Sequence, residues 1–371
     1  MKTYSKFLIN PINRNAFLNL VLKFTGLKAR IKDQLNLVSK LTVHKLVNSA
    51  KLFLSYHWSK ITRKPVQWGL PASISFEPTT SCNLRCPECP SGLRAFTRPT
   101  GMLENEFFKK AILQLKKQLH YLTFYFQGEP YLNPNFLEMV KFAHLNNIYT
   151  ATSTNAHYLK PSIAKKTIES GLDRLIISID GTSQETYESY RVGGKLEKVI
   201  EGARNIVEAK KEMNSTKPFV IFQFLVVRPN EHQIEEVLKL GKNIGVDEVR
   251  LKTAQVYDYK NGNELIPTLD KYSRYYQKKD GTWSVKNKMV NSCWRMWQGC
   301  VITWNGGVVP CCFDKDASHQ LGQLSKQDFK SIWKGEKYKG FRQAILQSRS
   351  EVDICKNCTE GTKVWGDKTA T

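Results

Sequence analysis

Short apolar segments alternate with helix-like segments between residues 72 and 253. This rhythm predicts a parallel α/β architecture, in which six βα units form a curved, partial TIM-like (β/α)6 barrel. Each strand is short enough that we expect it to be buried on both faces. The predicted strands are residues 72–78, 120–126, 148–154, 174–180, 219–227 and 248–253.

Several local patterns predict the helices of this barrel. Asn133 and Pro134 indicate a helix start, with asparagine as the N-cap and proline in the first helical position. Thr182 and Glu185 match a capping box, and residues 195–211 predict a long helix. Between the first two strands, apolar residues recur at helical spacing with lysines on the other side: Phe108, Ile112, Leu115 and Leu119.

The polar residues of the barrel follow the strands at the ends where the βα loops of such folds converge. A cysteine run follows the first strand, and the following strands are followed by residues 127–130, Asn155, residues 180–181 and Arg228. Because independent features agree on one end of the barrel, we expect a functional site there.

Composition divides the chain into four parts. Residues 1–70 form a basic helical extension, residues 71–255 the core, residues 256–290 a polar bridge, and residues 291–371 a small cysteine-rich domain. We interpret the bridge as a solvated connector, although its tyrosines and lysines also suit single-stranded nucleic acid. Asn305, Gly306 and Gly307 predict a hairpin turn in the last part.

The net charge of +23 is concentrated at the N-terminus, where residues 1–70 contain 13 Lys and Arg residues and a single acid, Asp33. Such a charge attracts anionic lipid, nucleic acid or an acidic partner. Two arrangements are open: an interfacial helix on anionic lipid, or a helical extension packed on the barrel with a solvated basic face. The residues concerned are Leu35, Val38, Leu46, Ala50 and Phe53, interleaved with Lys40, Lys45 and Lys51.

The cellular compartment follows from the apolar runs and the cysteines. No apolar run approaches the roughly 18 residues that a membrane span needs, and Pro11 and Asn13 interrupt the N-terminal ones, so we expect no secretory signal. Nine cysteines in two clusters fit metal ligation in a reducing cytoplasm better than disulfides. We therefore expect a cytoplasmic protein, membrane-peripheral if its N-terminal helix lies on lipid.

The most informative motif is the CxxxCxxC spacing of Cys82, Cys86 and Cys89, directly after the first strand. Thiolate is the soft ligand that iron–sulfur clusters select, and three thiolates leave one iron of a four-iron cubane open for a small molecule. A zinc knuckle or three buried thiols are the alternatives, but zinc motifs usually pair CxxC with a second CxxC.

The motif resembles that of radical S-adenosylmethionine (SAM) enzymes, and the resemblance covers roughly residues 72–253. It implies a 4Fe-4S cluster on Cys82, Cys86 and Cys89, whose open iron binds SAM. Gly128, Glu129 and Pro130 match the stretch that holds the methionine amino group, with Gln127 in place of the first glycine. Asn155, Ser178 and Arg191 occupy places comparable to SAM-binding positions of the family. Glu88 departs from the family's usual aromatic residue near the adenine.

Residues 290–365 resemble a SPASM domain, the auxiliary-cluster module of many such enzymes. The resemblance implies one auxiliary 4Fe-4S cluster on Cys293, Cys311, Cys355 and Cys358. Cys300 lies in a strand-like segment and is expected to be a packed thiol, while Cys312 could exchange roles with Cys311. A four-thiolate zinc site is the competing interpretation.

The resemblance implies an enzyme that reductively cleaves SAM, so that a 5′-deoxyadenosyl radical abstracts hydrogen from a peptide, protein or sugar-type substrate. An electron donor such as flavodoxin or ferredoxin is the expected partner, and the family motifs assign no acid–base catalytic residue. The alternative is a zinc-containing, basic nucleic-acid-binding protein. We consider nucleic acid the less favoured partner.

Overall fold

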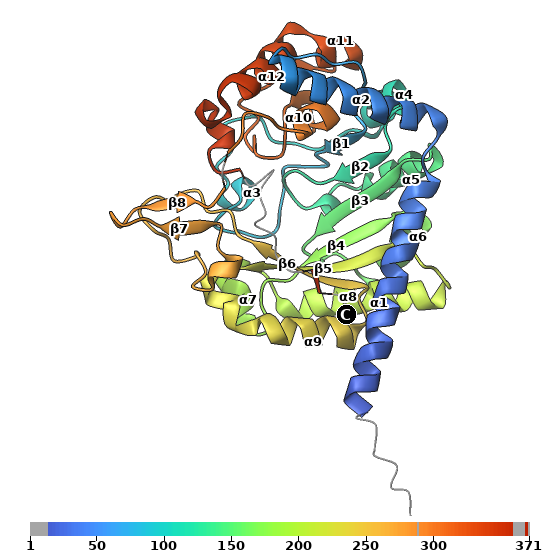
Figure 1. Cartoon of the computed structure of the whole chain (residues 1–371). Coiled ribbons are helices and arrows are strands. Elements are labelled where there is room, and N and C mark those ends of the chain that lie inside the picture. Colours follow the sequence, from blue (N-terminus) through green and yellow to red (C-terminus); the bar gives the residue numbers. More distant parts are fainter. Residues whose placement is uncertain (1–13, 288, 359–367, 370–371) are drawn as a thin grey trace, which may run out of the picture.

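The fold is an α/β partial barrel whose sheet continues into the C-terminal region (Figure 1). The computed structural model describes residues 14–287, 289–358, 368 and 369 of the chain, without the side chains of residues 14–26, 368 and 369. Ten strands form one sheet in the order β11-β10-β9-β1-β2-β3-β4-β5-β6-β12, and β7 and β8 form a separate hairpin. The strands are β1 (Ser73–Phe76), β2 (Tyr121–Phe124), β3 (Tyr149–Thr154), β4 (Arg174–Ser178), β5 (Phe219–Val226), β6 (Glu248–Thr253), β7 (Tyr275–Gln277), β8 (Trp283–Val285), β9 (Gly299–Ile302), β10 (Gly307–Val309), β11 (Gly322–Gln323) and β12 (Lys368–Thr369).

The six predicted barrel strands are confirmed as β1 to β6, all paired in parallel in chain order. The expectation that each strand is buried on both faces is wrong for β1 and β2, where buried and half-buried positions alternate. Ile74 and Phe76 pack into the main core. Ser73 and Ser75, on the other face of β1, line a cavity instead. The barrel is therefore apolar outside and partly polar inside.

Helices cover the outer face of the sheet, and two of the predicted helix starts shift. Thr182 is not the N-cap of the helix after β4, because the Ser183 hydroxyl accepts the Thr186 N–H. Asn133 is not an N-cap either. Its side-chain amide donates to the Pro78 and Leu103 carbonyls, and the next helix begins at Phe136. The helices are α1 (Arg14–Ser39), α2 (Val43–Thr62), α3 (Pro90–Leu93), α4 (Asn105–Leu115), α5 (Phe136–Leu145), α6 (Pro161–Glu169), α7 (Gln184–Tyr190), α8 (Leu196–Glu212), α9 (Ile234–Ile244), α10 (Arg295–Gln298), α11 (Phe329–Lys334) and α12 (Glu336–Ser348).

The C-terminal region extends the barrel sheet. Strand β9 pairs in parallel with β1, and β10 returns antiparallel to β9 through the hairpin that Asn305–Gly307 predicts. Gly306 has φ +88°, a conformation that glycine adopts without strain. At the opposite edge of the sheet, β12 pairs with β6. The cysteines around β9 and β10 are therefore fixed to the same framework as the loop after β1.

The bridge also packs on the site. Val256, Ile266 and Tyr275 form a small buried cluster with Leu84 and Cys86 of the cysteine loop. The bridge is thus more than a solvated connector, because it covers part of that loop.

The N-terminal helices α1 and α2 pack across the beginnings of the strands, on the right and top of Figure 1. Asp33 pairs with Arg174 at the start of β4. Lys40 donates to Asp173 Oδ2 at 2.7 Å and to the Ile148 carbonyl at 3.0 Å. Of the two open arrangements for the N-terminus, a helical extension packed on the barrel is what the structure shows, but its basic residues Lys40 and Lys45 are buried.

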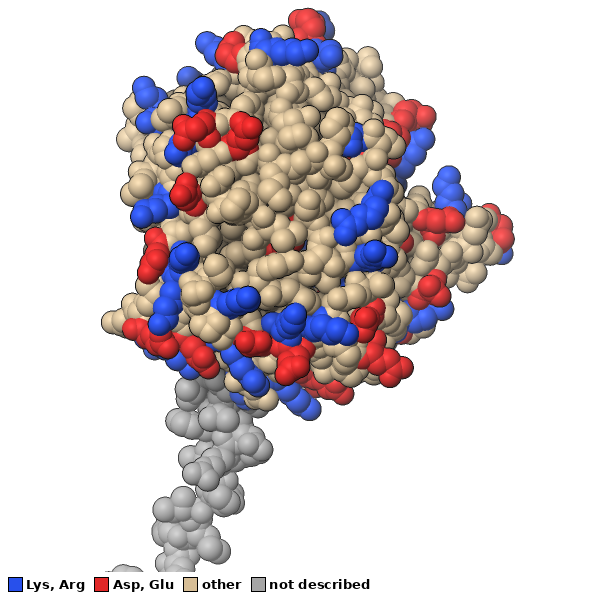
Figure 2. Space-filling model, turned by 180° about the vertical axis from the view of Figure 1, so that it is seen from behind, with Lys and Arg blue, Asp and Glu red and all other residues tan. Residues whose placement is uncertain are grey.

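Charged side chains are unevenly distributed over the surface. Figure 2 shows, on the face opposite to that of Figure 1, Lys, Arg, Asp and Glu side chains around the rim and the lower part, with a broad central area that lacks them. In the part of the chain that the structure describes, no helix has the length and apolar character needed to cross a bilayer.

Candidate active site

A cavity of about 260 Å³ lies where the barrel strands end, on the side opposite α1. It brings together the three cysteines of the loop after β1 with side chains from the ends of the next three strands and from the segment after α7. The predicted residues that line it are Cys82, Cys86, Cys89, Gly128, Glu129, Asn155, Ser178 and Arg191. Pro130 directly follows Glu129 and begins a short 3-10 turn. Residues from five separate chain segments therefore converge as predicted.

The cysteine loop presents its thiols to this cavity. The Leu84 N–H donates to Cys82 Sγ at 3.5 Å, and the Cys89 thiol donates to Gln127 Oε1 at 3.6 Å. Burial raises the pKa of the Cys82 thiol to about 11. A thiolate that is buried in this way is stabilised by a bound cation, and the iron ions of a cluster would be such cations.

The donor set fits an iron–sulfur cluster. Three thiols line one cavity, and thiolate is the ligand that iron–sulfur clusters select. The three cysteines are thus the residues that would hold a 4Fe-4S cluster, with the cavity left beside it for SAM.

Gly128 allows the chain to pass close behind the cysteine loop. It has φ +75°, and a Cβ atom there would lie 2.2 Å from the Thr79 carbonyl oxygen. Its N–H donates to the Ser91 hydroxyl at 2.9 Å, and the Glu129 N–H donates to the Ser81 carbonyl at 2.8 Å. Only glycine fits this position, and its backbone ties the second loop to the first.

Glu129 follows β2 and is buried against the end of β3. Its Oε1 accepts the Thr154 hydroxyl at 2.7 Å, and its Oε2 accepts the Asn155 N–H at 2.8 Å. Burial raises the pKa of this carboxyl to about 7, against the hydrogen bonds that lower it. Glu129 is therefore poised to accept a positive group in the cavity.

Asn155 and Ser178 line the same cavity from β3 and β4. The Asn155 side-chain amide donates to Asn83 Oδ1 at 2.8 Å, which links the end of β3 to the cysteine loop. Ser178 is the last residue of β4 and is 7% exposed. Ser178 is therefore held within a strand, and Asn155 is held directly after one.

Asp180 orients Arg191 and has no assigned role in the sequence analysis. Its Oδ2 accepts Arg191 Nε at 2.5 Å, while its Oδ1 accepts the Leu225 N–H at 2.6 Å. Arg191 Nη1 in turn donates to Cys86 Sγ at 3.6 Å. The position of Asp180 at the end of β4, eleven residues before Arg191, is the sequence feature that could have indicated this role.

Glu88 faces the bridge. Its carboxylate accepts the Tyr257 N–H at 2.8 Å. Lys315, from the C-terminal region, donates to the Glu88 carbonyl at 3.4 Å, and its Nζ lies 4.4 Å from the centre of the Tyr257 ring. Lys315 also lines the cavity, and no local sequence pattern indicated it.

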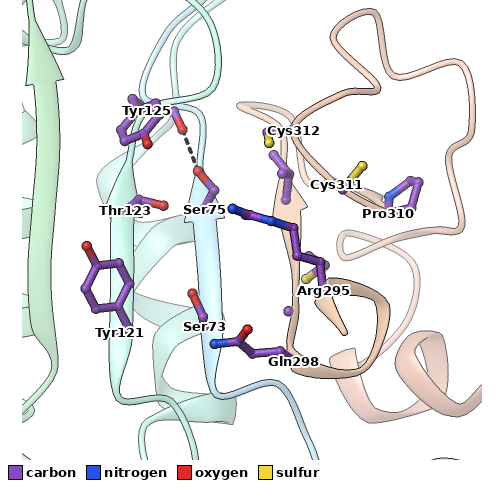
Figure 3. Close-up of a pocket in the computed structure, with 13 residues that line it drawn as sticks. Ser73, Ser75, Tyr121, Thr123, Tyr125, Arg295, Gln298, Pro310, Cys311 and Cys312 are labelled. Atoms are coloured by element: carbon purple, nitrogen blue, oxygen red, sulfur yellow. Dashed lines mark hydrogen bonds between the residues drawn. The ribbon is translucent and has the colours of Figure 1, made fainter. Parts of the chain in front are cut away.

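A second cavity of about 280 Å³ lies inside the barrel and shares Tyr125 with the first (Figure 3). Ser73 and Ser75 from β1, and Tyr121 and Thr123 from β2, line one side, and Arg295 reaches toward them from the other. Gln298, Cys311 and Cys312 complete its wall. The lining therefore combines hydroxyl, amide and guanidinium groups with the apolar groups of β9 and the cysteines.

The four predicted auxiliary ligands lie close enough to influence one another's ionisation. Burial raises the pKa of the Cys311 thiol, and the neighbouring Cys312, Cys293 and Cys358 act in the same direction. Burial also raises the pKa of the Cys355 thiol, and Cys293 adds to this rise. The buried Arg349 donates to Cys358 Sγ at 3.3 Å and to the Ser292 carbonyl at 3.0 Å.

The two remaining cysteines differ in their surroundings. Cys300 is buried in β9, as expected of a packed thiol, and Cys312 is exposed and lines the second cavity.

Comparison with protein families gives two matches. The Radical SAM superfamily model matches residues 76–241, and the SPASM model, described as an iron–sulfur cluster-binding domain, matches residues 293–359. The two matches cover the barrel and the cysteine-rich region, and they favour iron–sulfur chemistry over the zinc alternative.

The curated relatives have low sequence identity, but their alignments cover most of the chain. A tungsten-containing aldehyde ferredoxin oxidoreductase cofactor-modifying protein of Pyrococcus furiosus is 25% identical over 317 residues, which cover 77% of this chain and 86% of the relative. Mycofactocin maturase MftC of Mycobacterium tuberculosis is 24% identical over 315 residues, 78% of this chain and 75% of the relative. Among solved structures, Streptococcus suis SuiB bound to precursor peptide SuiA has a TM-score of 0.59 at 14% identity, covering 82% of this chain and 74% of that one. That likeness shows the shared fold.

Proposed function

The chain belongs to the radical SAM superfamily and carries a C-terminal SPASM domain, and from this premise we propose that it modifies a polar substrate by SAM-derived radical chemistry with the help of one auxiliary 4Fe-4S cluster. The observation that carries the proposal is the convergence of Cys82, Cys86 and Cys89 with Glu129 and Arg191 on one cavity.

The three cysteines, Glu129 and Arg191 have proposed tasks. When bound, the cluster and SAM supply an electron and a radical that removes hydrogen from the substrate. Cys82, Cys86 and Cys89 hold three irons, and Glu129 receives the methionine amino group. Arg191, oriented by Asp180, supplies a positive charge beside the Cys86 sulfur.

The second cavity is the proposed substrate site. Its hydroxyl, amide and guanidinium groups suit a peptide side chain or a sugar-type molecule, and it adjoins the first cavity at Tyr125. Cys311 lies in its wall, so an auxiliary cluster held there could ligate the substrate or accept an electron from it. Both substrate classes remain within the proposal, and a flavodoxin or ferredoxin is the proposed electron donor.

The proposal is tested with anaerobically reconstituted protein, SAM and dithionite. We expect release of 5′-deoxyadenosine, measured by chromatography. Full iron loading without that product would contradict the proposal. Zinc in place of iron, together with salt-sensitive binding of nucleic acid, would support the zinc-containing alternative.

The raised pKa of Glu129 predicts that SAM binding depends on pH. Below pH 7 the carboxyl is largely neutral and must lose its proton before it can pair with an ammonium group, so affinity rises with pH. We expect SAM to bind about fivefold more tightly at pH 7.4 than at pH 6, a range in which the amino group of SAM is still mostly protonated. Calorimetric titration of the reconstituted protein measures this. Glu129→Gln should flatten the profile, whereas the exposed control Glu106→Gln should keep it.

The number of auxiliary clusters is tested by single cysteine substitutions. Cys293→Ser should lower the iron content by about half, because one of two 4Fe-4S clusters loses a ligand. Cys300→Ser should keep the full iron content, since that thiol packs in β9. Iron analysis and absorption spectra of both variants measure the difference. Equal iron losses would show that Cys300 is a ligand.

A further inference from the structure

Helices α1 and α2 present polar side chains to the barrel and apolar side chains to solvent. On α1, Arg30 pairs with Glu248 at 3.1 Å and the Asn36 amide donates to Asp173 at 2.9 Å. On α2, the Lys45 ammonium and the Asn48 amide donate to backbone carbonyls. The buried positions of α2 are Lys45, Asn48, Leu52, Ser55 and Ser59. This reverses the usual pattern of a surface helix, whose apolar stripe faces the core.

The solvent side of both helices carries large apolar side chains, which we call the outer apolar face. They are Leu27, Ile31, Leu35, Val38, Val43, Leu46, Val47, Phe53, Leu54, Trp58 and Ile61. Val43 is 74% exposed and Ile61 is 78% exposed. More than half of the exposed large hydrophobic residues of the described chain fall within residues 27–68. A concentration of this kind marks a surface that is covered in use.

The exposed charges on the two helices that carry the outer apolar face are of one sign. The only acid in α1 and α2 is Asp33, which is buried in its pair with Arg174. The exposed charged residues of the two helices, among those whose side chains are described, are Lys28, Lys32, Lys51 and Lys60. Apolar and aromatic side chains framed by lysines are the composition that binds in the interface of an anionic membrane.

A cavity of about 370 Å³ beside α1 adds a place for an anionic headgroup. Lys28 and Lys32 line it, and neither enters an ion pair with the described residues. The three acids in its wall are each paired with a base: Asp33 with Arg174, Asp173 with Lys40 and Lys217, and Asp247 with Lys210. Phosphate groups could therefore meet two lysines whose charge is not neutralised by a neighbouring acid.

Other occupants of this face fit less well. A second copy in a two-fold symmetric contact would bring the same lysines together across the interface, with no acid to balance them. Nucleic acid is held mainly by Lys and Arg on phosphates, whereas this face is dominated by aliphatic and aromatic groups.

We propose that the outer apolar face docks the protein on the surface of an anionic lipid bilayer. The apolar side chains enter the boundary between headgroups and acyl chains, and the lysines pair with lipid phosphates. The inference does not depend on the proposed radical chemistry.

The test uses the full chain and vesicles of phosphatidylcholine with or without phosphatidylglycerol, separated by flotation. We expect binding to the anionic vesicles that weakens as salt is raised. Leu54→Ser/Ile61→Ser should lower the partition coefficient at least about tenfold, because two exposed apolar side chains no longer enter the lipid. Lys28→Glu/Lys32→Glu should lower binding to anionic vesicles only.

Matched controls lie on the β7–β8 hairpin and in the segment just before it; the hairpin is at the left of Figure 1, away from α1 and α2. Leu269→Ser/Tyr276→Ser and Lys278→Glu/Lys279→Glu change exposed residues in the same way and should bind vesicles as the parent does. Parent protein that stays off anionic vesicles would overturn the proposal, as would equal losses in the hairpin variants. If the parent forms a dimer and the Leu54→Ser/Ile61→Ser variant is monomeric, the face would be assigned to a second copy of the chain instead. Circular dichroism of each variant monitors folding.

Discussion

Replacing Cys82, Cys86 and Cys89 together with alanine should abolish release of 5′-deoxyadenosine from SAM and remove about half of the iron. The three thiols line the cavity that holds Glu129 and Arg191, so their loss removes every proposed protein ligand of the SAM-binding cluster. The auxiliary cysteines lie on other segments and should retain their iron.

This experiment contains its own control in the remaining iron. Iron content by colorimetric assay and product by chromatography are measured on the same reconstituted sample. A variant that keeps both the iron and the turnover of the parent would refute the assignment of Cys82, Cys86 and Cys89. Loss of all iron would instead point to a protein that no longer folds, which a thermal melt of the apoprotein distinguishes.

Asp180→Ala should lower the free energy of unfolding by about 3–5 kcal/mol and strongly reduce SAM cleavage, because it leaves the Arg191 guanidinium without its partner. Asp180 is fully buried and accepts both Arg191 and the Leu225 N–H. Denaturant titration measures the first effect, and product release the second.

A second variant separates positioning from stability. In Asp180→Ala/Arg191→Leu no buried charge is left unpaired, so part of the stability should return while SAM cleavage stays low. Asp247→Ala is the matched control, since Asp247 pairs with Lys210 at 2.7 Å and accepts the Val220 N–H at the opposite end of the strands. It should cost less stability and leave SAM cleavage intact. Full activity in the double variant would remove Arg191 from the proposed site.

The sequence predicted the parts of the fold that depend on local pattern. The six barrel strands and the hairpin at Gly306 are where apolar runs and turn residues place them. The helix starts near Asn133 and Thr182 were misplaced for different reasons: Ser183 took over the capping role from Thr182, whereas the Asn133 amide is engaged by two backbone carbonyls and the helix that begins at Phe136 has no side-chain cap. Caps depend on single hydrogen bonds, which pattern alone does not rank.

The candidate site divides in the same way. The cysteine spacing and the residues that follow each strand predicted a common cavity, and the structure brings them together. Asp180 was noticed at a strand end but given no role, and Lys315 was missed because it reaches the cavity from a segment more than 200 residues beyond the cysteine loop. Contacts between residues so far apart in the chain produce no local or periodic pattern in the sequence.

The N-terminal helices were the least predictable part. Their lysines were expected on a solvated face, yet Lys40 and Lys45 are buried where strand beginnings offer carboxylate and carbonyl partners. Charge counts report how many lysines a segment has, and the tertiary contacts decide which of them reach water.

The position of α1 and α2 also fixes which way the molecule faces. Both helices lie at the beginnings of the strands, through contacts such as Asp33 with Arg174, whereas the cysteine loop follows the end of β1. A protein resting on lipid through these helices would turn the mouth of its reaction chamber toward the aqueous phase. A bulky or chain-like reactant could then be delivered from solution, while the membrane serves only as an anchorage.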